Sequence, residues 1–420
     1  MSSPDPENSA STEKQPLNAL IVREGEGVQD AVPIADGIFA SKGISNSYLV
    51  TTPAGDLLIN TGMYNEAEQI RTRFSAVSAN PVRVIVFTQG HPDHVGGWSQ
   101  LDAPGIETIA QANHPDVREY FHRLQPFFAR RSRRLWNRDI TRVDPTYQPP
   151  EPVLTTTFLD SHTFTLGGRR IELYSTPGGE TTDSLVVWLP DERILFTGNL
   201  FGPLFGHIPN LYTVRGDKIR SAIAYLHSVD RVIGLAPDLL ITGHGEPIRG
   251  AENIRTRLTQ MRDATQYVRD RTIGGMNAGV DLWTLMGQIT LPPELAIPQG
   301  HGKVPWIVRA IWEEHTGWFR YESTTELYDV PPSAIYEELI ELAGGTAPLI
   351  DRAETHLAAG RALEALHFAE IVLSQTPKDP VALRVQLEAH ELLLARSGRE
   401  NFSEVRWLEA EIRDIREALS

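Results

Sequence analysis

The 420-residue chain contains no cysteine, which excludes a disulfide framework, a thiolate metal site and a cysteine nucleophile. It also has no uninterrupted apolar run long enough to cross a bilayer. The first residues, Met1 to about Pro16, are rich in Ser, Pro, Asn and Glu and have no apolar signal core. We therefore expect a cytoplasmic protein without a membrane span.

Positive charge is in deficit along the chain. Lys and Arg total 39 against 54 Asp and Glu, which gives a formal net charge of −15. Such a chain repels nucleic acid phosphates and anionic lipid, so neither is an expected partner. The local exception is Ala129-Arg130-Arg131-Ser132-Arg133-Arg134, which fits either a solvated helical face or a cationic rim for an anionic substrate.

Apolar periodicity divides the chain into three parts. Residues 1–30 are expected to form a disordered tail, and residues 31–260 alternate short strands with helices, which predicts α/β layers. From 261 to 420 the period is helical, with breaks at Gly360, Pro377 and Gly398. The short loops predict antiparallel, tetratricopeptide-like hairpins, whose apolar faces suit either association or packing within one chain.

The most informative stretch runs from Val84 to Trp98, where an apolar, β-branched strand ends in closely spaced potential metal ligands. The spacing sends His91 and Asp93 in the same direction, while His94 approaches from the next turn. We expect Gly96-Gly97 to let the backbone bend tightly beneath this site. The alternative is a polar turn with two hydrogen-bonded histidines, which leaves the rest of the pattern unexplained.

Further polar loops interrupt apolar runs at Thr176–Leu185, at Thr197-Gly198-Asn199 and at His244. Loops between buried strands are where additional ligands are expected. His244 directly follows a strand and is interpreted as a ligand, whereas Glu180 is equally consistent with a solvated acidic residue. His207 and the histidines from His301 onward lie in no motif and are interpreted as structural or surface residues.

The stretch from Gln89 to Gly97 resembles the histidine motif of the metallo-β-lactamase superfamily, His-x-His-x-Asp-His followed by Gly-Gly, with Gln89 in place of the first His. Pro177-Gly178-Gly179-Glu180 resembles its alkylsulfatase branch, as does Asn210-Leu211-Tyr212-Thr213-Val214-Arg215-Gly216. The resemblance covers about Ala31 to Ser420, without the sterol-carrier-like third domain usual in that branch. It implies an αββα sandwich over residues 31–260 and an all-α homodimerisation region over 261–420.

The resemblance also implies two sets of metal ligands. One set would be Gln89, His91 and Glu180, and the other Asp93, His94 and His244. The bridging carboxylate usual in the family has no counterpart, because its loop offers only Gly198 and the neutral Asn199. Asn60 likewise stands where the family usually has an Asp behind the ligands.

These departures remove anionic or strongly coordinating groups from the first site and from the bridge. The second site keeps three protein ligands and room for water, which is the arrangement of a catalytic zinc. We therefore expect one firmly bound Zn²⁺ per chain and a second that is weak or absent.

The implied activity is metal-dependent hydrolysis of a small anionic ester, a sulfate ester of a hydrophobic alcohol. Metal-activated water would attack, and Asp93 could accept its proton. Arg215 would bind the anion together with Asn210, Tyr212 and Thr213, although it fits a surface charge at a helix start equally well.

Two alternatives remain open at the level of sequence. One is a single-metal hydrolase of another substrate, such as a lactone, thioester, phosphodiester or β-lactam. The other is a non-catalytic scaffold with a decayed metal site, whose helical tail binds a partner.

Overall fold

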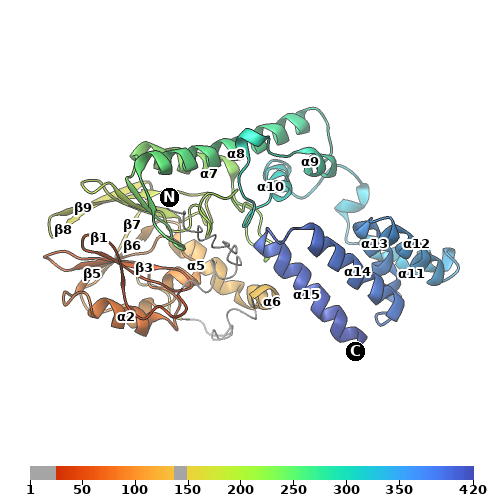
Figure 1. Ribbon diagram of the computed structural model, residues 1–420, viewed down its shortest axis with the longest axis horizontal. Coiled ribbons are helices and arrows are strands. Elements are labelled where there is room, and N and C mark those ends of the chain that lie inside the picture. The colour runs from red at the N-terminus through yellow and green to blue at the C-terminus, as the bar shows by residue number, and fades with distance from the viewer. Residues whose placement is uncertain (1–24, 137–148) are drawn as a thin grey trace, which may run out of the picture.

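The computed structural model describes residues 25–136 and 149–420, so most of the predicted tail at residues 1–30 lies outside the described residues. Two β-sheets face one another at one end of the molecule (Figure 1). The strands of the first sheet follow chain order, antiparallel from β1 to β4 and parallel from β4 to β7. They are β1 (Val32–Ala35), β2 (Ile38–Ser41), β3 (Ser47–Val50), β4 (Asp56–Ile59), β5 (Val82–Val86), β6 (Glu107–Gln111) and β7 (Thr156–Phe158).

The second sheet has the order β13-β12-β11-β10-β9-β8. Only β11 and β12 pair in parallel, and the other neighbours are antiparallel. Its strands are β8 (Ser161–Leu166), β9 (Arg169–Ser175), β10 (Leu185–Leu189), β11 (Ile194–Phe196), β12 (Leu239–Ile241) and β13 (Ile248–Arg249).

Apolar side chains of the two sheets meet in a shared core. Ile59 and Val86 of the first sheet join Leu173, Phe196 and Ile241 of the second, all at most 1% exposed. The central strands β4 and β10 are buried at every position, because helices cover the outer face of each sheet as well. The predicted αββα sandwich is thus confirmed.

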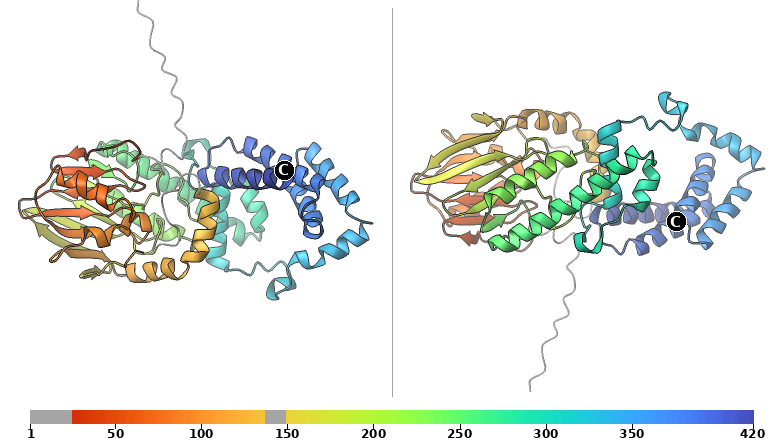
Figure 2. Two further views of the ribbon diagram at one scale, coloured as in Figure 1. Left: turned by 90° about the horizontal axis from the view of Figure 1, so that it is seen from below. Right: turned by 90° about the horizontal axis from the view of Figure 1, so that it is seen from above.

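The covering helices belong to two layers. Ile70 and Phe74 of α2 pack against Leu58 and Ile85 on the first sheet, while α7 and α8 run along the second (Figure 2). The helices of this part are α2 (Ala67–Ser75), α3 (Pro92–Val95), α4 (Trp98–Leu101), α5 (His114–Arg123), α6 (Gln125–Trp136), α7 (Ala222–Leu235) and α8 (Ala251–Asn277).

Helix α8 confirms a periodicity that the sequence predicts. The five positions expected on one face are all buried, namely Ile254, Leu258, Met261, Ala264 and Val268. The helix runs without a break through residues 260 and 261, where the sequence places a domain boundary. That boundary stays a prediction.

The remaining residues are mainly helical, and α12 to α15 form the predicted side-by-side hairpins. The elements are α9 (Leu282–Gln288), η1 (Pro293–Leu295), α10 (Val304–Thr316), η2 (Thr324–Leu327), η3 (Pro332–Ile335), α11 (Tyr336–Leu342), α12 (Ala347–Ala358), α13 (Ala362–Gln375), α14 (Pro380–Arg396) and α15 (Phe402–Leu419). Among the residues described, no helix is both long enough and apolar enough to cross a membrane.

The last helix, α15, returns to the sandwich. Arg134 of α6 donates to Glu411 at 2.5 Å and stacks its guanidinium 4.8 Å from the Trp407 ring. At the start of α15, Asn401 donates to the carbonyl of Gln299 at 2.8 Å. One arginine of the basic cluster therefore holds the helical region against the sandwich.

Candidate metal centre and anion pocket

Loops that follow the central strands of both sheets meet at one edge of the sandwich. In the first sheet, the Asn60 N–H after β4 donates to Val86 O of β5 at 2.9 Å. In the second, the Gly243 N–H after β12 donates to Gly198 O after β11 at 2.8 Å. Asn46 then donates its backbone N–H to Gly243 O across the two sheets at 2.7 Å. These backbone bonds fix the loops that carry the predicted ligands.

The structure brings Asp93, His94 and His244 together. Asp93 Oδ2 lies 3.5 Å from His94 Nε2 and 3.6 Å from His244 Nε2, and the three candidate ligand atoms lie within 4.8 Å of one another. Within residues 25–136 and 149–420, this is the one group of three His, Asp or Glu donors spaced to hold a metal ion.

The donor set fits a single divalent metal. The His94 side chain is 0% exposed, and its Nε2 is buried without a hydrogen-bond partner. A bound metal ion would supply that partner. Two imidazoles and a carboxylate are a combination that zinc accepts. These three residues would hold the ion.

Burial and neighbouring charges oppose one another at these ligands. Burial lowers the pKa of His94 to about 4 despite the nearby Asp93 carboxylate, so the ring is neutral at pH 7. Burial alone would raise the pKa of Asp93, but His94 and His244 outweigh it and hold that pKa below its usual value. An ionised carboxylate and neutral rings are the forms that bind metal.

The paired glycines below the site have a role other than the expected bend. Gly96 and Gly97 both have ordinary helical angles, with φ of −61° and −83°. A Cβ at Gly97 would lie 2.2 Å from Thr61 O, a distance that no side chain tolerates. Close backbone approach, rather than conformational freedom, therefore requires glycine at position 97.

The second predicted ligand set is also adjacent, but it contains a fixed cation. His91 Nδ1 lies 3.2 Å from Glu180 Oε2 and 3.0 Å from Gln89 Nε2. Arg220, which the sequence does not single out, places Nη1 3.6 Å from Glu180 Oε1. Burial would raise the pKa of Glu180, but Arg220 and His91 hold it well below its usual range.

Asn199 joins the two halves of the site. Its Nδ2 donates to Glu180 Oε2 at 3.0 Å and lies 3.2 Å from His244 Nε2. Its Oδ1 is buried without a hydrogen-bond partner. A neutral amide thus lies between the two ligand sets, and it donates a hydrogen bond to the Glu180 carboxylate.

Two more residues beside the site escape the sequence analysis. Asp217 Oδ2 lies 3.9 Å from His91 Nε2 and 3.8 Å from Arg220 Nη2. His301 is interpreted from sequence as structural or surface, yet it lies 4.0 Å from Glu180 Oε1, and burial lowers its pKa to about 3. Asp217 directly follows the predicted substrate segment and Arg220 comes three residues later, and this proximity in sequence could have pointed to them. His301 has no such signal, because packing of the helical region brings it there.

The predicted substrate residues lie around these groups. Asn210 Nδ2 is 3.4 Å from His301 Nε2, and Arg215 Nη2 is 3.8 Å from Asp217 Oδ2. Tyr212 and Thr213 line an adjacent cavity. Asn210 and Arg215 thus contact residues beside the second ligand set, whereas Tyr212 and Thr213 line the cavity.

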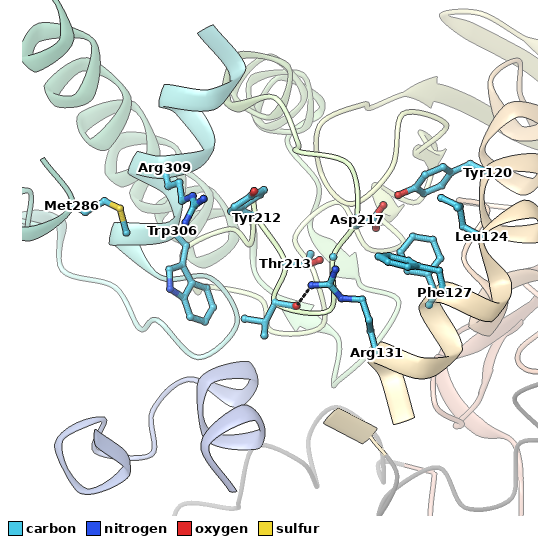
Figure 3. A pocket seen from close by; sticks show the side chains of 13 residues that line it. Tyr120, Leu124, Phe127, Arg131, Tyr212, Thr213, Asp217, Met286, Trp306 and Arg309 are labelled. Atoms are coloured by element: carbon cyan, nitrogen blue, oxygen red, sulfur yellow. Dashed lines mark hydrogen bonds between the residues drawn. The ribbon is translucent and has the colours of Figure 1, made fainter. Parts of the chain in front are cut away.

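The cavity has a volume of about 550 Å³ and mixes aromatic, aliphatic and charged side chains (Figure 3). Arg131 enters from α6 and donates to Val214 O at 3.3 Å, so the basic cluster does contribute a cation beside the site. Its lining residues are Tyr120, Leu124, Phe127, Phe128, Arg131, Tyr212, Thr213, Val214, Gly216, Asp217, Met286, Trp306 and Arg309.

Comparisons with known proteins agree with this architecture. Residues 40–244 match the model of the metallo-beta-lactamase superfamily, and residues 284–406 match that of alkyl sulfatase dimerisation. Residues 40–244 thus form a metallo-beta-lactamase domain, and an alkyl sulfatase dimerisation domain follows it. The second matched region and the alkylsulfatase relatives support the alkylsulfatase-like branch of this superfamily, which confirms the resemblance.

The relatives are longer than this chain. A linear primary-alkylsulfatase of Pseudomonas sp. is 28% identical over 327 residues, which are 71% of this chain and 60% of that protein. Alkyl/aryl-sulfatase BDS1 of Saccharomyces cerevisiae is 22% identical over 390 residues, 83% of this chain and 58% of the relative. The solved structure of the stereoselective inverting sec-alkylsulfatase Pisa1 from Pseudomonas sp. superposes with a TM-score of 0.83 at 19% identity, covering 93% of this chain and 66% of that one. The last comparison supports the fold alone.

Proposed function

We propose that the protein hydrolyses sulfate esters of hydrophobic alcohols with one divalent metal ion, zinc, held by Asp93, His94 and His244. The proposal depends above all on what surrounds the cluster of Asp93, His94 and His244. The cluster lies beside a buried arginine and next to a cavity lined by apolar and aromatic groups. The alkylsulfatase names of the relatives support the choice of substrate.

The charge balance favours an anionic substrate only when a metal is present. Three carboxylates and two guanidinium groups form ion pairs around the two ligand sets, namely Asp93, Glu180, Asp217, Arg215 and Arg220. The carboxylates outnumber the guanidinium groups by one. A divalent cation therefore makes the local charge positive, which an anionic ester requires.

Separate side chains would accept a proton, bind the sulfate and accommodate the alcohol. When bound, the metal supplies an activated water for hydrolysis. Asp93 Oδ2 faces both imidazoles and can accept a proton there. Arg220 is buried and its Nε and Nη2 lack hydrogen-bond partners, so they are available to a sulfate oxygen. The apolar cavity wall accommodates the alcohol chain.

A homodimer formed through the C-terminal helices is part of the same proposal. The segment from residue 318 to 342 runs outside the other helices in Figure 2. It exposes an unusual number of apolar side chains, as expected of an interface. They are Trp318, Tyr321, Leu327, Tyr328, Val330, Ile335, Leu339 and Leu342. We expect light scattering after size exclusion to give twice the chain mass, and Tyr328→Glu with Leu342→Glu to halve it. A cytoplasmic location stays a prediction.

The activity test is sulfate release from linear alkyl sulfates by the full chain supplied with zinc. We expect turnover of decyl sulfate, and loss of at least about 100-fold in His94→Ala or His244→Ala because each removes a metal ligand. His227→Ala, on the exposed side of α7, is the matched control and should keep full activity.

Other substrates separate the remaining alternatives. If decyl sulfate is inert while a lactone, thioester, phosphodiester or β-lactam is cleaved with the same dependence on His94 and His244, the substrate assignment is wrong and the metal site stands. If no substrate depends on these histidines, the protein is a scaffold.

A further inference from the structure

Asn60 lies directly behind the metal ligand His94. It ends β4 in a left-handed conformation with φ of 62°, and its side chain is 1% exposed. Its Nδ2 lies 2.9 Å from His94 Nδ1, while the opposite ring nitrogen, Nε2, faces Asp93. The two nitrogens of the ring therefore face different partners, the buried Asn60 and the half-buried Asp93.

The orientation of the Asn60 amide follows from an unambiguous donor. The Thr88 backbone N–H donates to Asn60 Oδ1 at 2.9 Å, and Thr88 Oγ1 lies 3.0 Å from the same oxygen. Rotating the amide would point Nδ2 at the Thr88 N–H and bury two opposed donors, a costly arrangement. The oxygen must face Thr88, so the NH₂ group must face His94.

A donor at Nδ1 determines where the ring carries its proton. Because Asn60 Nδ2 can only donate, His94 Nδ1 must accept, and the single ring proton then sits on Nε2. Nε2 is also the atom that would bind a metal beside Asp93. A metal must therefore displace this proton, and the ring must then carry it on Nδ1, opposite the Asn60 donor.

We propose that Asn60 is a positioning residue that weakens zinc binding, because it holds His94 in the tautomer with the proton on Nε2. This inference rests on the metal site of the proposed function and deepens it. It predicts weaker binding than the firmly bound ion expected from the sequence, in spite of three suitable ligands. Metal occupancy then depends on the supply of zinc rather than being permanent.

Gln89 shows why Asn60 is special. Gln89 Nε2 makes the same kind of contact with His91 Nδ1, at 3.0 Å, but Gln89 Oε1 has no partner. That amide can rotate without breaking another hydrogen bond, so it imposes no tautomer. At Asn60, by contrast with Gln89, a backbone N–H locks the amide.

The first measurement is the tautomer of His94 in the metal-free full chain, read from long-range ¹H–¹⁵N ring correlations and assigned with His94→Gln. We expect the proton on Nε2. A proton on Nδ1 in the unsubstituted chain would overturn the inference, and this result does not depend on whether any variant folds.

The second measurement is zinc affinity by competition with a chromophoric chelator. Asn60→Asp offers one oxygen to Thr88 and the other to His94, and Asp tolerates a left-handed φ. We expect it to move the ring proton to Nδ1 and to tighten zinc binding roughly 10–100-fold. Asn277→Asp adds the same charge at an exposed site at the end of α8. It should change neither the position of the ring proton of His94 nor the zinc affinity.

The outcomes separate this inference from the proposed function. Equal zinc affinity in the unsubstituted chain and Asn60→Asp would sink the role of Asn60 and leave the metal site intact. If neither chain bound zinc, the proposed hydrolase would lose its metal, while the ring-proton measurement would still decide what Asn60 does.

Discussion

Arg220 Nη1 lies 3.6 Å from Glu180 Oε1, and neither side chain is more than 7% exposed. The pair occupies the half of the site where the resemblance implies a second metal. Arg220 also donates to Asn210 O at 2.7 Å, which orders the segment that carries the predicted substrate residues. A protein cation thus lies beside Glu180 in the half of the site where the resemblance implies a second metal.

Substitution of Arg220 alone should be strongly destabilising. Arg220→Met leaves the Glu180 carboxylate buried without its partner, and we expect a loss of roughly 3–5 kcal/mol in the free energy of unfolding. Urea denaturation of the metal-free chain measures it. Arg220→Met with Glu180→Gln removes both charges and should recover most of the loss. A single variant as stable as the unsubstituted chain would contradict the pairing.

The number of metal ions per chain should be one. Plasma mass spectrometry of protein purified without chelator and then loaded with zinc should give about one zinc ion per chain, because three suitable donors converge only once among the residues described. His244→Ala should bring the value near zero, whereas Gln89→Ala should leave it unchanged. Two ions per chain would mean that Gln89 or Asn199 coordinates after all.

Stability should fall in acid partly through His207. Burial, with a smaller effect of Arg257, lowers the pKa of His207 to about 4 from its usual 6.5. Between pH 4 and 6.5 the folded state thus binds fewer protons than the unfolded state. The contribution of His207 to the free energy of unfolding is therefore full above pH 6.5 and is lost as the pH falls through 4.

We expect this group to account for roughly 1–3 kcal/mol of the free energy of unfolding between pH 6.5 and 4. His207 Nδ1 accepts the Gly300 N–H at 3.0 Å, and Asn at this position can accept it without titrating. His207→Asn should flatten the pH dependence in urea titrations. An unchanged slope would show that the ring is protonated as easily in the fold as in the unfolded chain.

The cavity wall should determine preference for the alcohol chain. Phe128 of α6 lines the cavity and lies 5.6 Å from the Phe121 ring, which in turn packs 5.1 Å from the His91 ring. Phe128→Ala removes apolar contact, so we expect KM for decyl sulfate to rise about 10-fold. KM for butyl sulfate, which reaches less of the wall, should change little. Equal effects on the KM values of both substrates would show that the alkyl chain of the substrate binds elsewhere.

Much of the fold could be read from local pattern. Strand ends with polar loops, and the helical spacing of α8, depend on neighbours in sequence, so periodicity reveals them. The cluster of His91, Asp93 and His94 is equally local, because a strand end and one short helix present it. Adding His244 needed only the knowledge that loops of this family converge.

The tertiary structure decided what lies between these ligands. His301 reaches Glu180 because Asn401 at the start of α15 holds the segment around residue 300, an arrangement that spans a hundred positions in sequence. The tautomer of His94 likewise depends on how Asn60 and Thr88 meet across two strands. Residue types along the chain determined which groups could bind a metal. Only their hydrogen-bond partners in the fold decide how readily they do so, because proton position is set by contacts and not by residue identity.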